Sequence, residues 1–187
     1  MEQTKKHSEG IRPRLAGALI LAAFILYGGG QALIASGQVG LGLTLVLINS
    51  LAVLGIAVSL RPIIAKENPR TGNIYLVTRI VEGLFLGASG LVLALMNNVD
   101  LSDTLYQTGM IALGLGSISF CHWLLVNKRI PGLLAWLGLA GYPLLVAGMV
   151  LAFAGMDTLS MILLVPGALF EIVVGLYLIF VGMRPSS

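Results

Sequence analysis

The sequence predicts an all-α, polytopic membrane protein with six transmembrane helices and both termini in the cytoplasm. Three observations predict this fold: an apolar composition, six apolar stretches long enough to cross a bilayer, and a one-sided distribution of basic residues. Of the 187 residues, 57% are hydrophobic and only 10% are charged, whereas soluble domains carry about 25% charged residues. Water is therefore the wrong solvent for most of this chain.

The six apolar stretches justify the helix count. A helix of about 20 apolar residues crosses the roughly 30 Å hydrocarbon layer, and it satisfies its own backbone groups there. The expected spans are 15–36, 40–61, 73–96, 105–127, 131–155 and 159–182. The first is too long for the core of a secretory signal. Together the spans form one transmembrane domain over 15–184, preceded by a basic cytoplasmic segment over 1–14, with the second and third spans followed by breaks at 62–69 and 97–104.

The basic residues fix the expected orientation, because Lys and Arg near span ends stay on the cytoplasmic side. With the N-terminus inside, ten of the 11 Lys and Arg residues fall on that side, and the opposite loops contain none. The ten are Lys5, Lys6, Arg12, Arg14, Arg61, Lys66, Arg70, Lys128, Arg129 and Arg184. A missed span would invert every later segment and destroy this segregation. The charges therefore support the number six independently of hydropathy.

Several function classes are excluded or disfavoured by composition. The basic residues stand at the ends of apolar runs, so they do not form the basic face with interleaved aromatics that nucleic acid requires. Cys121 is the only cysteine and His7 and His122 are the only histidines, which leaves no credible ligand set for zinc or haem. We expect no cofactor, no metal and no catalytic residues. His122 and Trp123 are expected at the membrane interface, with Trp123 as an anchor.

Three charged residues lie inside the predicted spans: Arg79 and Glu82 in the third and Glu171 in the sixth. Each such group costs about 2.5 to 3.5 kcal/mol near a helix centre unless it finds a partner. Arg79 and Glu82 are three residues apart, so they share a helix face. Glu82 and Glu171 have similar expected depths, about 15 and 18 Å from the inner helix ends. If the third and sixth spans pack together, Arg79 can bridge both acids.

Neighbouring residues favour that packing. Tyr75 and Ser89 extend the polar stripe of the third span, and glycines beside it and in the sixth span have the spacing that lets helix backbones approach. Asn49, near the middle of the second span, is expected either to complete the cluster or to bond a neighbouring helix carbonyl. The candidate binding or packing cluster is Arg79, Glu82, Glu171, Asn49 and Tyr75.

Three segments resemble a bacterial membrane family, domain of unknown function 4386. They are TRIVEGLFLG at 78–87, GLGSISFCHWLLVNKRIPGLLAWLGLAGY at 114–142 and VPGALFEIVVGLYLIFVG at 165–182. The resemblance extends from about 12 to 184, and it implies the fold, a bacterial inner-membrane location and the placement of the three charged residues. The loops after the first and third spans are shorter than in the family pattern, so no role of those loops is carried over. The resemblance implies no mechanism.

Three functional hypotheses follow. The first is a non-enzymatic helix bundle that binds a lipid, a hydrophobic small molecule or a partner membrane protein, including a second copy of itself. The second is a small proton-linked or cation-linked transporter that uses Glu82 and Glu171 near the midplane. The third, a membrane enzyme, has no recognisable catalytic set. The basic cytoplasmic rim should also favour anionic lipid head groups.

Overall fold

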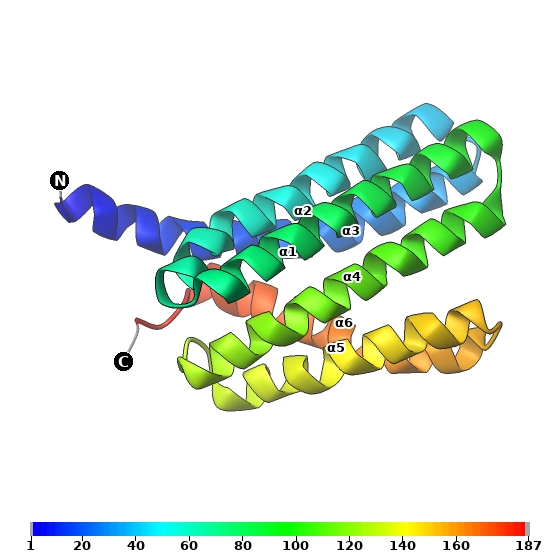
Figure 1. The fold of residues 1–187 in the computed structure, drawn as a ribbon. Coiled ribbons are helices and arrows are strands. Elements are labelled where there is room, and N and C mark those ends of the chain that lie inside the picture. The colour runs from blue at the N-terminus through cyan, green and yellow to red at the C-terminus, as the bar shows by residue number, and fades with distance from the viewer. Residues whose placement is uncertain (1, 186–187) are drawn as a thin grey trace.

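The computed structural model of the protein describes residues 2–185, and the side chains from Ile11 onward. All regular structure in this part of the chain is helical. The helices are α1 (Glu2–Ala35), α2 (Val39–Glu67), α3 (Pro69–Met96), α4 (Val99–Val126), α5 (Gly132–Phe153) and α6 (Asp157–Phe180). All six are long and apolar enough to cross a membrane, which confirms the predicted number of such helices. Figure 1 shows them as an elongated bundle with both ends of the chain at the same end.

The connections between helices are shorter than the sequence indicated. The predicted break at 62–69 was wrong, because α2 continues through Pro62 to Glu67 and only Asn68 separates it from α3. The predicted break at 97–104 was also too long, since α4 begins at Val99. The Asn68 side chain accepts a hydrogen bond from the Thr71 backbone N–H (3.0 Å) and caps α3 at its first turn. A capping asparagine thus replaces an extended loop.

The N-terminal segment is also helical rather than separate from the first span. The first helix starts at Glu2 and continues without a break through Pro13 into the membrane-spanning part. Lys5, Lys6 and His7 lie outside the residues whose side chains are described. Within the part whose side chains are described, the helix segment that is apolar enough to cross a membrane lies in Ile11–Ala35.

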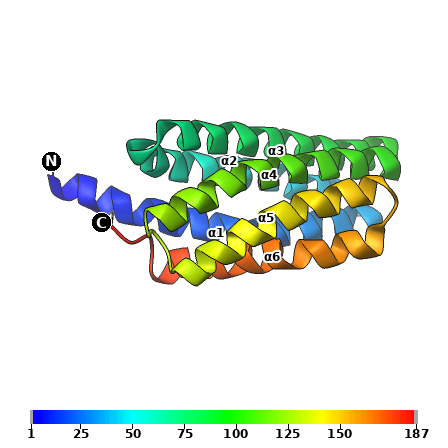
Figure 2. The ribbon, with the colours of Figure 1, turned by 60° about the horizontal axis from the view of Figure 1, so that its bottom comes forward.

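The helices form a closed ring in chain order. Each packs on the next one along the chain, and α1 packs on α6 to close the ring. Figure 2 shows α2 and α3 along one side of the bundle and α5 and α6 along the other, with α4 crossing obliquely between them. In this arrangement α3 and α6 lie opposite each other. The expectation that these two helices pack together was therefore wrong.

The glycines that suggested this packing serve other helix pairs. A Cβ on Gly83 would lie 3.2 Å from the Ser50 carbonyl oxygen, and one on Gly90 would lie 2.5 Å from a methyl of Val46, so this stripe packs on α2. On α6, Gly175 packs against Gly17 of α1, where a Cβ on Gly17 would lie 2.5 Å from the Gly175 carbonyl oxygen. The small residues were correctly interpreted as sites of close backbone approach, but their partners are sequence neighbours and the first helix.

At the end of the bundle that holds the termini, Arg129 connects the segment after α4 to the end of α2 and to the segment after α6. Its guanidinium pairs with the Glu67 carboxylate at the end of α2 and donates to the Arg184 carbonyl (2.8 Å), and the Arg184 backbone N–H donates to the Arg129 carbonyl (2.9 Å). The Arg129 guanidinium also lies 5.5 Å from the Trp123 ring centroid. Trp123 is only 3% exposed, so its expected role as an interfacial anchor was wrong.

Candidate functional site

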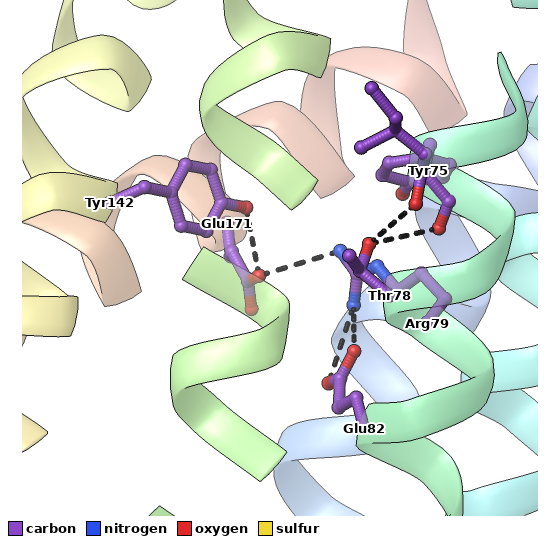
Figure 3. Close-up of polar contacts among 7 residues, drawn as sticks. Tyr75, Thr78, Arg79, Glu82, Tyr142 and Glu171 are labelled. Carbon is purple, nitrogen blue, oxygen red and sulfur yellow. Dashed lines mark hydrogen bonds and ion pairs between the residues drawn. The ribbon is translucent and has the colours of Figure 1, made fainter. Parts of the chain in front are cut away.

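The three charged residues of the predicted cluster meet inside the ring (Figure 3). The Arg79 Nη1 donates to both carboxylate oxygens of Glu82, at 3.1 and 3.4 Å, and its Nη2 lies 3.7 Å from Glu171 Oε1. The Arg79 and Glu82 side chains are only 5% and 4% exposed, and that of Glu171 is 16% exposed. The first pair follows from the three-residue spacing on one helix, and the second joins α3 to α6.

This second contact crosses the centre of the bundle rather than a helix interface. Because α3 and α6 lie on opposite sides of the ring, the long Arg79 side chain reaches inward from one side and Glu171 from the other. Lipid cannot reach Arg79 or Glu82 in this arrangement. The cost of placing charge in hydrocarbon is thus offset by pairing inside the protein.

Two tyrosines support the cluster. The Tyr142 hydroxyl on α5 donates to Glu171 Oε1 at 2.9 Å, and this side chain was not among the predicted site residues. Tyr75 lies one turn before Arg79 on α3, with the Arg79 guanidinium carbon 5.2 Å from the Tyr75 ring centroid, which is cation–π distance. The Tyr75 hydroxyl is buried without a hydrogen-bond partner among the described residues. Tyr75 therefore contacts the cluster through its ring.

Asn49 reaches the same region from α2 but makes no hydrogen bond to the cluster. Its side chain is 1% exposed, and both its amide nitrogen and its amide oxygen are buried without a partner among the described residues. The alternative expectation, a bond to a neighbouring helix carbonyl, is not met either. Leaving a buried polar group unpaired costs about 1 to 3 kcal/mol. Buried polar groups without a partner are rare in proteins. Asn49 lines a pocket, so a molecule bound there could supply the missing partner.

This pocket has a volume of about 220 Å³ and lies in the interior between α1, α2, α3, α4 and α6. Its walls are mostly apolar, and Asn49, Glu82 and Glu171 are its strongly polar groups. The lining residues are Ala23, Phe24, Tyr27, Gly28, Asn49, Val53, Glu82, Leu86, Tyr106, Met110, Leu113 and Glu171. Two of the three charged residues and the unpartnered amide thus face one common space.

The exposed rim of the pocket lies at mid-length of the bundle. Phe24, which is 40% exposed, and Gly28 are the exposed lining residues, whereas Asn49, Glu82 and Leu86 at the inner wall are buried. Gly28 precedes the end of α1 at Ala35 by seven residues, which corresponds to about 10 Å along the helix. In a helix that crosses a bilayer, this position falls beside acyl chains rather than water.

The pocket is closed toward the end that lacks the termini. The rings of Tyr27 and Tyr106 are stacked there with centroids 5.4 Å apart. The Tyr27 hydroxyl is hydrogen-bonded to Ser89 Oγ (3.2 Å), which in turn is hydrogen-bonded to Ser102 Oγ (2.9 Å). These contacts join α1, α3 and α4 above the pocket. Both tyrosines were missed from the sequence, although a tyrosine within an apolar span usually needs a partner for its hydroxyl.

The comparisons with known proteins concern the second half of this structure. Residues 92–182 match the model of the family named Domain of unknown function (DUF4386). The resemblance to DUF4386 is confirmed over this stretch. The DUF4386 match begins in the last turn of α3 and includes α4, α5 and α6. Tyr142 and Glu171 therefore lie within the DUF4386 match, whereas Arg79 and Glu82 lie before it. No curated protein and no solved structure matches the chain.

Proposed function

We propose that this protein binds a compact amphipathic molecule inside the membrane, without catalysing a reaction. The observation that carries the proposal is the pocket of about 220 Å³, which combines apolar walls with two carboxylates and an unpartnered amide. Small-molecule sites typically have this character, mostly apolar with a few convergent polar groups. A cavity of about 150 Å³ accommodates benzene, so this pocket suits a compact molecule of somewhat larger size.

The position of the rim supports access from the bilayer. Phe24 and Gly28 border the pocket at mid-length of α1, and the stacked Tyr27 and Tyr106 cover it toward the nearer end of the bundle. A molecule that partitions into lipid would reach this rim laterally. Its apolar body would contact the walls, and its polar group would reach the amide of Asn49.

The exposed lining residues of the pocket also allow a comparison with the alternative function, a proton-linked or cation-linked transporter. That function requires Glu82 and Glu171 to be reached from water on at least one side. The exposed lining residues lie instead at the depth of acyl chains, so the binding role is the better supported of the two.

Two adjacent glycines allow a matched test. Gly28 lines the pocket and Gly29 does not, yet a Cβ at either position meets no atom within 4 Å. We expect Gly28→Trp to obstruct the rim, whereas Gly29→Trp places the same ring on the same helix outside the pocket. The wild-type protein and both variants would be purified from native membranes in mild detergent. Native mass spectrometry and analysis of the extracted small molecules would then identify what each protein retains.

We expect a small molecule to be retained by the wild type and by Gly29→Trp and to be lost from Gly28→Trp. An equal content of bound molecules in all three proteins would reject the pocket as the binding site. Equal melting temperatures for the two variants would exclude unfolding as the reason for any loss.

We further propose that the chain is a bacterial inner-membrane protein with both termini in the cytoplasm. Apart from Arg79, the described Lys and Arg residues lie toward those helix ends, or in the segments, at the end of the bundle that holds the termini, which agrees with the positive-inside rule. The basic residues at this end of the bundle would attract anionic lipid head groups. A partner membrane protein or a second copy of the chain would use the lipid-facing outer surface, where Leu133, Ile25 and Phe180 are at least 75% exposed.

A further inference from the structure

We propose that the molecule bound in this pocket is a cation, namely a compact apolar amine. The inference rests on the proposed binding function and specifies the chemical class of the ligand. It draws on the charges that face the pocket, on the hydrogen-bonding groups left without partners, and on the aromatic rings in the walls.

The charges that face the pocket are negative. Glu82 and Glu171 are lining residues, whereas Arg79, which pairs with both, is not. The lining residues contributed by α1, α2 and α4 carry no formal charge. One guanidinium for two carboxylates leaves one negative charge in excess, and this excess faces the cavity. A bound cation would neutralise it, which matters most where the surroundings are apolar.

The hydrogen-bonding groups at the pocket are mainly acceptors. In the described part of the chain, Glu171 accepts one hydrogen bond, from Tyr142, and its 3.7 Å separation from Arg79 is too long for another. Glu82 accepts only from Arg79 Nη1. A carboxylate has about four acceptor sites, so both retain capacity. The Asn49 oxygen is a third acceptor, beside the amide nitrogen of the same side chain, the one unpartnered donor among these groups. A primary ammonium group carries three donors and no acceptor, which matches this surplus.

The walls suit the remainder of an amine. Phe24, Tyr27 and Tyr106 contribute aromatic rings from α1 and α4. Aromatic faces attract cations at distances up to about 6 Å, and they also contact apolar groups. Leu86, Leu113 and the other aliphatic residues complete an apolar wall. A rigid hydrocarbon bearing one ammonium group satisfies the shape, the charge and the donor requirement together.

Two probes of the same shape, one charged and one neutral, separate the effect of the ligand's charge from that of its shape. 1-Aminoadamantane and 1-adamantanol share one hydrocarbon cage, but the amine is cationic at neutral pH and the alcohol is neutral. Binding of each tritiated probe would be measured by scintillation proximity on the full-length protein in phosphatidylcholine nanodiscs, with excess unlabelled probe to define saturable binding. Phosphatidylcholine carries no net charge, so the lipid itself does not concentrate the cation.

We expect the wild type to bind the amine saturably, and about tenfold or more tightly than the alcohol, because hydrogen bonds between charged groups are stronger than neutral ones. Glu171→Gln should reduce this preference to about twofold or less, since it removes the excess charge. Asp157→Asn is the matched control: it makes the same change on the same helix at its exposed first turn, and it should leave the preference intact.

Equal affinity of the wild type for amine and alcohol would overturn the cation proposal and leave the proposed binding function standing. A preference that survives in Glu171→Gln would also overturn it, because the charge would then come from elsewhere. If neither probe binds the wild type saturably while the glycine variants differ in a natural ligand, the pocket binds a molecule of another class. The comparison of probes on the wild type needs no variant, so a folding defect in Glu171→Gln cannot obscure the result.

Discussion

Replacement of Arg79 by methionine tests the most sharply defined interaction in the structure. Methionine keeps most of the volume of the side-chain stem but removes the only cation that contacts Glu82 and Glu171 among the described residues. Because the Arg79 and Glu82 side chains are at most 5% exposed, solvent does not screen their interaction. Breaking a buried ion pair by removing one partner costs about 3 to 5 kcal/mol. We expect Arg79→Met to lower the free energy of unfolding by that amount.

A double variant separates the loss of the pair from the loss of packing. In Arg79→Met/Glu82→Met both members of the pair on α3 become apolar, and such replacements are often neutral or stabilising. We expect the double variant to recover most of the lost stability and to lie within about 1 to 2 kcal/mol of the wild type. Arg61→Met serves as a control, because Arg61 is exposed and bonds only Asn73 among the described residues. It should change stability by about 0.5 kcal/mol or less.

Unfolding would be followed by circular dichroism during titration of mixed micelles with sodium dodecyl sulfate, and reversibility would be checked by dilution. The reasoning would be refuted if Arg79→Met were as stable as the wild type. It would also be refuted if the double variant were as unstable as the single one, because the loss would then not come from leaving the Glu82 carboxylate without its partner.

Two further predictions concern helix packing and the rim of the pocket. A Cβ at Gly116 would lie 1.8 Å from Thr78 Oγ1, so Gly116→Ala should separate α3 from α4 and lower the melting temperature by several degrees, consistent with a loss of about 1 to 3 kcal/mol. Gly132→Ala, where nothing lies within 4 Å, should change it little, and equal effects would contradict the packing. In a Trp123→Phe/Trp136→Phe background, the fluorescence of Phe24→Trp should be quenched more by lipids brominated deep in the acyl chain than by aqueous iodide. Stronger quenching by iodide would mean that the rim faces water.

The sequence predicted correctly those features that depend on the length, the apolarity or the residue spacing of a single helix. The six spans follow from length and apolarity, and the contact between Arg79 and Glu82 follows from their spacing on one face. Helix ends were less predictable. Pro62 suggested a break, but helices in membranes often continue past proline, and the asparagine that ends α2 is a single residue.

The glycine pattern of the sequence did not reveal which helices pack on one another. A glycine stripe indicates that another backbone approaches, but it carries no information about which one, so Gly83 and Gly175 were assigned to each other's helices instead of to α2 and α1. Arg79 nevertheless contacts Glu171, because a long side chain can cross the interior of a ring. The pocket was not predictable at all, since it depends on space left by residues from five helices.

Closure of the ring between α1 and α6 makes the interior depend on the presence of every helix. Because α6 packs on both α5 and α1, the ring of helices is closed only when α6 is in place. Arg79 and Glu82 stand on one helix, whereas Glu171 contacts Arg79 and Tyr142 only when α6 is packed in the ring. A chain that lacks α6 would therefore leave a gap in the ring between α1 and α5 and would lose the contacts of Glu171 with Arg79 and Tyr142.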